Sequence, residues 1–436
     1  MGGERRGGIG VELDGSCIIV VARDEGGLPM EQEMKEEHKA RLRKLQSMLQ
    51  RHNAQAYMVT QNVDLFYFTG SMQNGYLLVP VEGEPVFFVR RSVSRATEES
   101  AVHVKPLGSM RSFGDALKLE FPQIFDSRYP ETYPVTVATE FDVLPVQAYL
   151  RLQSALPNIC LVDGSNWIRE IRMIKSPCEI GKIERAAAAV DRALEQALTH
   201  IHEGTTELEF ISRIEYYLRL QGHFGMIRMR AYNQEVFGIA VSGEAAAQPT
   251  YFDGPAGGQG LSAASPQGSG YRSMKKNEPI LIDLGCCIDG YVIDQTRTAV
   301  IGELQQHLLD AYALSEEILH QTEILLKPGT TCEQLYEQAL KQAEEAGLSD
   351  HFMGFVADQV KFLGHGIGLE IDEFPVLAKG FKYLLEPGMV IAIEPKFTFP
   401  GNGVVGVEDT YVITETGCRR LTVSRRGVIR IKEPIS

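Results

Sequence analysis

Residues 279–302, "PILIDLGCCIDGYVIDQTRTAVIG", contain two apolar runs on either side of an Asp-Gly dipeptide at 289–290. Asp-Gly between two such runs is a strong signal for a β-hairpin with a two-residue turn. This register places Asp294 opposite Gly285 and makes Asp283 its diagonal neighbour on the same face. Two carboxylates among isoleucine, leucine and valine are costly unless a cation neutralises them. The hairpin therefore predicts a divalent metal site, and the alternative is an edge strand whose carboxylates face solvent.

A second stretch, residues 388–414, "GMVIAIEPKFTFPGNGVVGVEDTYVIT", has the same character. "PGNG" at 400–403 predicts a turn, across which Glu394 and Glu408 fall almost opposite each other. His365, in "GHGIG", would add an imidazole; a lone histidine is more often structural, and only the carboxylates make it a candidate ligand. Such an oxygen-rich set suits two divalent ions, with Mn, Co, Fe or Zn as candidates. Two bridged ions lower the pKa of a shared water, so hydrolysis is the expected chemistry.

The two hairpins follow similar helical segments. "HEGTTELEFISRIEYYL" at 202–218 and "KPGTTCEQLYEQAL" at 327–340 each read as helix, Gly-Thr-Thr, helix, with a threonine placed to cap the second helix. The alternative is that Gly-Thr-Thr is merely a common turn between helices. The similar helix lengths on both sides favour a duplicated, pseudo-symmetric domain.

The chain before these segments alternates between helix and strand patterns, in runs such as "AYMVT", "EPVFFVRR" and "NICLVD". Ser176, Pro177 and Glu179 then form a capping-box signature that starts a new helix. We therefore expect three parts: an N-terminal extension that could be disordered (1–33), an α/β domain (34–165) and a catalytic domain (166–436).

Composition excludes several classes of partner. The chain has 436 residues, a net charge of −14 and seven scattered cysteines without CxxC spacing. The acidic balance without a basic block argues against nucleic acid or an anionic membrane as a partner. The cysteine pattern suggests neither a disulfide framework nor a zinc ribbon. We expect no signal peptide, because Glu12 and Asp14 precede the short apolar run near the N-terminus, and we expect a cytoplasmic location.

The motifs "IDLG", "GYVIDQTRT", "GHGIGLE", "IEP" and "VEDTYVIT", together with "IRMIKSPCEI", resemble the pita-bread metallopeptidase family. Within it, the chain is similar to the group of Xaa-Pro dipeptidase (prolidase), aminopeptidase P and creatinase, over roughly residues 34–430. The resemblance implies an α/β (α+β) protein with a creatinase-like N-terminal domain and a pseudo-symmetric pita-bread catalytic domain. It also implies a homodimer and a dinuclear centre, with manganese as the first candidate. The matching metal ligands are Asp283, Asp294, His365, Glu394 and Glu408.

Three positions depart from the family pattern. Thr250 and Asp372 stand where histidines are expected, and Gly406 stands where an arginine is common. All three fall in the shell that contacts substrate, so the pattern indicates a retained metal site with altered substrate handling. The Gly-rich loop 254–270 points the same way, although it could equally be a solvated connection. Asp372 is the strongest candidate to replace a lost histidine, and the others are Tyr251, Asp253 and Tyr291.

Three functions are compatible with these residues. The first is a dinuclear metallohydrolase that cleaves a small peptide or amide, in which a metal-bound hydroxide attacks the carbonyl and Glu394 or Glu408 assists proton transfer. The catalytic candidates are Glu394, Asp372 and Thr250. The second is a non-peptidase metalloenzyme, a creatinase-like hydrolase or a lyase of a small zwitterionic compound. The third is a binding protein that keeps its metal only for structure.

Overall fold

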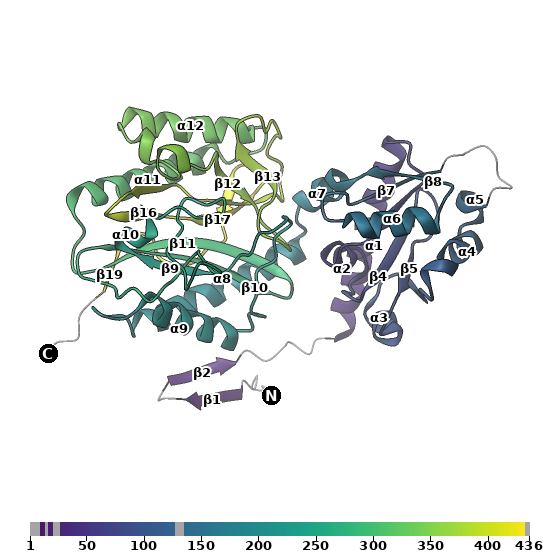
Figure 1. The fold of residues 1–436 in the computed structure, drawn as a ribbon, viewed down its shortest axis with the longest axis horizontal. Helices are drawn as coiled ribbons and strands as arrows, with labels where there is room; N and C mark the ends of the chain where they lie inside the picture. The colour runs from purple at the N-terminus through teal and green to yellow at the C-terminus, as the bar shows by residue number, and fades with distance from the viewer. Residues whose placement is uncertain (1–8, 14–15, 21–26, 127–134, 432–436) are drawn as a thin grey trace, which may run out of the picture. The chain divides into compact units, whose positions relative to one another are not determined.

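The computed structural model describes residues 9–13, 16–20, 27–126 and 135–431, with side chains from residue 34 onward. The chain forms two compact units, Arg23–Ile171 and Arg172–Ser436, the second together with Met1–Ala22 (Figure 1). The boundary expected from the sequence lies at residue 165. Much of the predicted extension 1–33 lies outside the described residues, but β1 (Ile9–Leu13) and β2 (Ser16–Val20) pair as antiparallel strands.

The N-terminal unit is a six-stranded mixed sheet with helices. Its strand order is β6-β5-β4-β3-β7-β8, and the apolar runs of the sequence form the expected strands. Strands β3, β4 and β5 are buried almost throughout, as their near-continuous hydrophobic character requires. The elements are α1 (Gly27–Arg51), β3 (Ala56–Val59), α2 (Asn62–Thr69), β4 (Gly75–Pro80), β5 (Val86–Val89), α3 (Val93–Glu99), β6 (His103–Pro106), α4 (Met110–Glu120), α5 (Pro122–Phe125), β7 (Val135–Thr139), α6 (Val146–Ala155), β8 (Ile159–Asp163) and α7 (Ser165–Met173).

The C-terminal unit is built from two similar halves, each a helix pair followed by a β-hairpin. Figure 1 shows the α8–α9 pair and the α11–α12 pair on opposite sides of the sheets. The sheets have the orders β19-β11-β10-β9 and β13-β12-β14-β17-β18, and β15 and β16 form a further pair. The first half comprises α8 (Pro177–Leu198), α9 (Glu207–Leu220), β9 (Ile239–Ser242), α10 (Gly243–Ala246), β10 (Pro279–Ile288) and β11 (Tyr291–Ile301). The second comprises α11 (Gln306–Leu325), α12 (Cys332–Glu345), β12 (Phe362–Gly366), β13 (Glu373–Ala378), β14 (Val390–Ile393), β15 (Lys396–Phe399), β16 (Gly403–Gly406), β17 (Asp409–Ile413), β18 (Cys418–Arg420) and β19 (Ile429–Ile431).

The helix starts confirm the predicted caps. Thr206 and Thr331 each cap the second helix of their pair, and each forms a reciprocal capping box with the residue three positions later. Ser176 forms the same box with Glu179 at the start of α8. Each box satisfies two backbone N–H groups that a helix start would otherwise leave unpaired.

The strand registers are also those expected. Gly285 pairs with Asp294 across the first hairpin. In the second half β14 pairs with β17 and β15 pairs with β16 in one continuous register, which places Glu394 opposite Glu408 at the junction between the two ladders. Both carboxylate pairs therefore result from hairpin geometry. None of the helices among the described residues is long and apolar enough to cross a membrane.

Candidate metal centre

Three buried side chains from three strands converge in the C-terminal unit. Asp294 lies on β11, His365 lies on β12, and Glu408 immediately precedes β17. One donor atom of each lies within 4.8 Å of a donor atom of the other two. Their strands are hydrogen-bonded in sheets, so the backbone is fixed and the donor atoms are held close together. Two carboxylates and an imidazole form a donor set that suits a divalent transition metal.

The other two predicted ligands join this group around a lysine. Lys396 Nζ donates hydrogen bonds to Glu394 Oε2 at 2.6 Å, to Asp283 Oδ2 at 3.1 Å and to Glu408 Oε2 at 3.2 Å. Lys396 is fully buried. It is absent from the candidates drawn from the sequence, although its place two positions after Glu394 in a strand indicates a shared face.

The remaining oxygen of Glu408 supplies the test of whether a metal fits. Glu408 Oε1 is buried and accepts no hydrogen bond from any described residue. An orphaned buried carboxylate oxygen is expensive unless a cation satisfies it. Glu394 Oε1 lies 3.6 Å from His365 Nε2, beside the same space. The residues therefore fit a divalent ion between Asp294, His365, Glu394 and Glu408.

The charge balance of the cluster also indicates that a metal cation binds there. Burial raises the pKa of the carboxyls of Asp283, Glu394 and Glu408, and it raises that of Asp294 well above its ordinary range because the neighbouring carboxylates add to it. Burial alone would lower the pKa of Lys396, but the surrounding carboxylates outweigh it and hold the ammonium charged. Four carboxylates exceed what one ammonium neutralises, so the cluster favours a further cation.

His365 is oriented for metal binding by its other ring nitrogen. Nδ1 lies 3.1 Å from the backbone oxygen of Gly366 and 3.3 Å from Asp372 Oδ1. Both neighbours accept hydrogen bonds, so the proton resides on Nδ1 and the lone pair of Nε2 is directed into the cluster. Asp372, at φ 61°, has the left-handed backbone conformation that Asp tolerates better than most residues. Asp372 therefore positions His365.

The loop after His365 is held by buried ion pairs. Arg172 contacts Glu370 at 2.8 Å and also pairs with Glu373, and Lys175 pairs with Glu373 at 3.1 Å. Burial would raise the pKa of Glu373, but Arg172 and Lys175 lower it to about 2. These pairs attach the motif "GLEIDE" to the segment that precedes α8, and this keeps His365 and Asp372 in place.

A cavity of about 70 Å³ opens beside the cluster. It is lined by all five predicted ligands, by Asp372 and by both ends of the Gly-rich loop. Residues 255–258 and 267–270 of that loop are buried, whereas most of its tip is exposed. The loop therefore forms part of the cavity wall. Asp253 lies in the wall as well, and burial together with the charge of Asp372 raises its pKa.

The remaining sequence candidates lie elsewhere. Thr250 is outside the set of described residues that line the cavity, and its hydroxyl accepts a hydrogen bond from the backbone N–H of Phe252. Tyr291 is buried and donates to Glu179, and Tyr251 is half-exposed. Gly406 lies opposite Lys396 in the β15–β16 ladder. Among the departures from the family pattern, Asp372 therefore lies at the metal cluster and Gly406 lies behind it.

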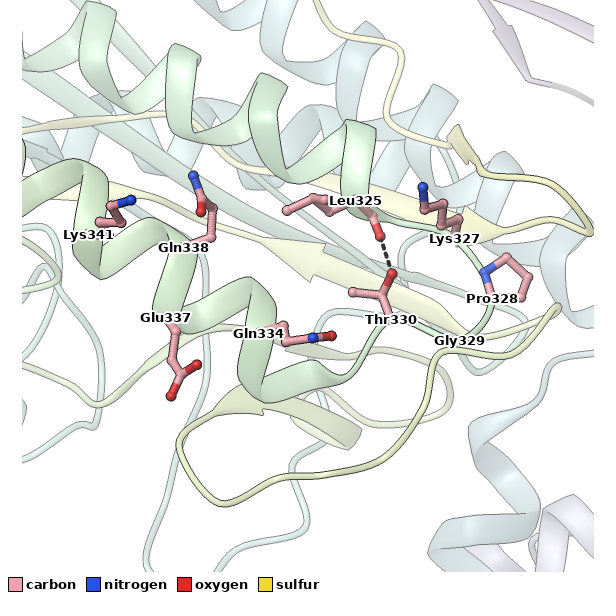
Figure 2. A pocket seen from close by; sticks show the side chains of 9 residues that line it. All are labelled: Leu325, Lys327, Pro328, Gly329, Thr330, Gln334, Glu337, Gln338 and Lys341. Atoms are coloured by element: carbon pink, nitrogen blue, oxygen red, sulfur yellow. Dashed lines mark hydrogen bonds between the residues drawn. The ribbon is translucent and has the colours of Figure 1, made fainter.

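A larger hollow of about 620 Å³ lies at the turn between α11 and α12. Figure 2 shows its side chains, among them Thr330, whose hydroxyl donates to the backbone oxygen of Leu325. The charged residues in this lining, Lys327, Glu337 and Lys341, are exposed to solvent. The described lining of this hollow brings together no buried carboxylates or imidazoles, so the smaller cavity at the cluster is the candidate active site.

Comparison with known proteins agrees with this geometry. The profile of Metallopeptidase family M24 matches residues 181–415, and that of the Creatinase/Prolidase N-terminal domain matches residues 41–174. The chain belongs to metallopeptidase family M24. This confirms the predicted fold class, with its creatinase-like and pita-bread parts, and the prediction of a metallohydrolase.

Relatives in the M24 family match most of the chain. It is 26% identical over 393 residues to the Xaa-Pro dipeptidase of Pyrococcus furiosus, which covers 90% of this chain and 100% of the relative. It is 31% identical over 300 residues to the Xaa-Pro dipeptidase of Lactobacillus delbrueckii subsp. lactis, covering 68% of this chain and 73% of the relative. The crystal structure of the prolidase from Pyrococcus horikoshii OT3 superposes with a TM-score of 0.73 at 26% identity, covering 89% of this chain and 100% of that one.

Proposed function

We propose that this M24 protein hydrolyses a small peptide or amide of the Xaa-Pro type. The observation that carries the proposal is the orphaned Oε1 of Glu408, which faces Asp294 and His365 beside an internal cavity. The names of the relatives, Xaa-Pro dipeptidases and a prolidase, support the substrate class. Asp283, Asp294, His365, Glu394 and Glu408 are our proposed site residues.

A divalent ion held by Asp294, His365, Glu394 and Glu408 would polarise the scissile carbonyl and lower the pKa of a water. Asp372 keeps the proton of His365 on Nδ1. We place Asp253, which lines the cavity with Asp372, as the candidate to give a proton to the leaving amine. Thr250 is not among the described lining residues, and its hydroxyl accepts a hydrogen bond from the backbone of Phe252, so we assign it no contact with the reacting atoms.

We further propose Mn²⁺ as the metal, a homodimer as the assembly and the cytoplasm as the location. Oxygen-rich donor sets with one imidazole suit Mn²⁺, with cobalt, iron and zinc as competitors. The homodimer is the state that the family resemblance implies. Light scattering on the eluted peak of a sizing column would test it, and a monomer mass would contradict it.

A panel of Xaa-Pro dipeptides tests the main proposal. The purified protein is loaded with Mn²⁺, and release of proline is followed with and without a chelator. We expect turnover that disappears on chelation and returns on adding metal. If a fully metal-loaded protein cleaves none of the dipeptides, the peptidase assignment is wrong.

One observation favours a second candidate, a non-peptidase metalloenzyme acting on a smaller amide or zwitterion. The cavity of about 70 Å³ is small compared with sites for drug-sized ligands, which span roughly 300–1,000 Å³. Turnover of a small amide, with none of the dipeptides, would select this candidate. The same metal-loaded preparation serves both assays.

A further inference from the structure

Lys396 is the least expected member of the metal cluster. It opens β15 directly after Pro395, and its ammonium ends between three carboxylates. A lysine ammonium has three N–H groups and no acceptor, so these three bonds use all of its donors. Lys396 therefore acts as a fixed cation that is already fully paired, and it has no donor left for substrate.

The backbone opposite Lys396 makes room for its stem. Gly406 pairs with Lys396 across the ladder. A Cβ at Gly406 would lie 2.7 Å from Lys396 Cγ and equally close to the backbone oxygen of Pro395. Real Cβ atoms do not approach that closely, so any side chain at 406 would force both the Lys396 stem and the backbone at 395–396 to shift. Gly406 therefore leaves the room in which the observed Lys396 side chain lies.

The lysine divides the carboxylate oxygens into two groups. Asp283 Oδ2, Glu394 Oε2 and Glu408 Oε2 face the ammonium. The second oxygens of the two glutamates form the other group, which faces away from the ammonium. Glu394 Oε1 lies near His365 Nε2, and Glu408 Oε1 accepts no hydrogen bond from the described residues. One group thus surrounds a cation that the chain supplies, and the other forms a site for a cation from solution.

We propose that the Lys396 ammonium takes the place of one of the two divalent ions expected at this centre, so that the protein binds a single ion between Asp294, His365, Glu394 and Glu408. A second divalent ion on Asp283 and Glu408 would lie beside a buried ammonium, where like charges repel strongly. One divalent ion and one ammonium leave the four carboxylates with a single net negative charge. The inference rests on the proposed function only in requiring a bound metal.

Metal stoichiometry tests the inference without an activity assay. The full chain and the variants Lys396→Ala and Lys341→Ala are loaded with Mn²⁺ and desalted, and bound manganese per chain is measured by mass spectrometry. Lys341 is exposed on α12, away from the cluster, and serves as the matched control. We expect one ion per chain in the unchanged protein and in Lys341→Ala, and two in Lys396→Ala, where the second ion replaces the lost charge.

Electron paramagnetic resonance of the unchanged protein gives a second readout that needs no variant. An isolated Mn²⁺ gives a six-line spectrum, whereas two bridged ions give an exchange-coupled spectrum. Two ions per chain with a coupled spectrum would overturn the inference and leave the proposed function intact. One ion with an isolated spectrum and no turnover of any substrate would support the inference and overturn the proposed function. An unchanged single ion in a folded Lys396→Ala would also overturn the inference.

Discussion

The two halves of the C-terminal unit deliver their carboxylates in different ways. In the first half one unbroken ladder runs from Pro279 and Val300 to the turn, and both aspartates lie within it. In the second half the ladder is interrupted at Glu394 and Pro395, where β14 ends and β15 begins in a separate sheet. Proline lacks an N–H group and cannot continue the ladder. The interruption places Lys396, from the start of the next ladder, beside Glu394. The second half thus brings a lysine ammonium to the cluster together with its carboxylates.

The halves are joined by a buried ion pair as well as by the cluster. Arg297 on β11 contacts Asp409 on β17 at 2.7 Å, and both side chains are fully buried. Arg297 also donates to the backbone oxygens of Glu408 and Ser424. The pair therefore fixes the backbone beside Glu408.

The largest effect should come from removing the imidazole, which the second half alone supplies. We expect His365→Ala to lower kcat/KM on the substrate by about 10³-fold. The variant loses several kcal/mol of transition-state stabilisation by the metal, and each 1.4 kcal/mol corresponds to about a tenfold change in rate. Steady-state kinetics at fixed Mn²⁺ measures this. His320→Ala, on the exposed side of α11, is the control and should change little. Equal activity of the two variants would remove His365 from the site.

The next largest effect should come from breaking the link between the halves. Arg297→Met leaves Asp409 with Arg420 and Arg426 but takes the donor away from the buried backbone oxygens of Glu408 and Ser424. We therefore expect the free energy of unfolding to fall by about 2–3 kcal/mol. Urea denaturation measures the loss. Arg185→Met, which breaks an exposed pair with Asp289, should cost roughly 1 kcal/mol or less. A similar cost for both variants would mean that the buried pair is no more important than the surface pair.

A smaller effect should follow from loosening His365 without removing it. Asp372→Ala takes away one of the two acceptors at Nδ1, and we expect Mn²⁺ affinity to fall about 10–100-fold. Isothermal titration measures the affinity. Asp358→Ala removes an exposed carboxylate in the same segment of the chain and should leave the affinity unchanged. Unchanged binding in Asp372→Ala would show that Gly366 alone orients the ring.

The smallest effect tests the equivalence of the two helix pairs. Thr206→Ala and Thr331→Ala each remove one capping box, and we expect each to cost about 1 kcal/mol of stability. Urea denaturation of the two variants in parallel measures the costs. If only one substitution lowered stability, the two halves would differ in how strongly they depend on their caps.

The features that the sequence predicted are local ones. The caps at Ser176, Thr206 and Thr331 depend on residues three apart, and the hairpin registers depend on turns of two to four residues. Once a turn is fixed, the period of two in a strand determines which side chains share a face. The sequence alone is therefore enough to place Asp283 and Asp294 together.

The features that the sequence did not predict depend on distant packing. Lys396 follows a proline at a ladder break, so the pattern alone does not say whether its ammonium reaches solvent or the cluster. The motif position of Thr250 indicates a place in the site, but the path of the backbone before the Gly-rich loop brings Asp253, and not Thr250, into the described lining of the cavity. The motif position of Asp372 leaves a proton donor and a hydrogen-bond partner both open, and its distance of 3.3 Å to His365 Nδ1 favours the second role.

The close approach of the two strands at position 406 also decides what a substitution there would have to move. Besides the Lys396 stem, a Cβ at 406 would lie 2.7 Å from the backbone oxygen of Pro395 and 2.8 Å from the Cα of residue 396, and these two distances do not depend on the lysine side chain. An arginine introduced at 406 therefore requires the β15–β16 backbone to shift, whichever residue stands at 396. Bringing this protein to the common family pattern at 406 is thus a change of strand spacing and not only of side chains.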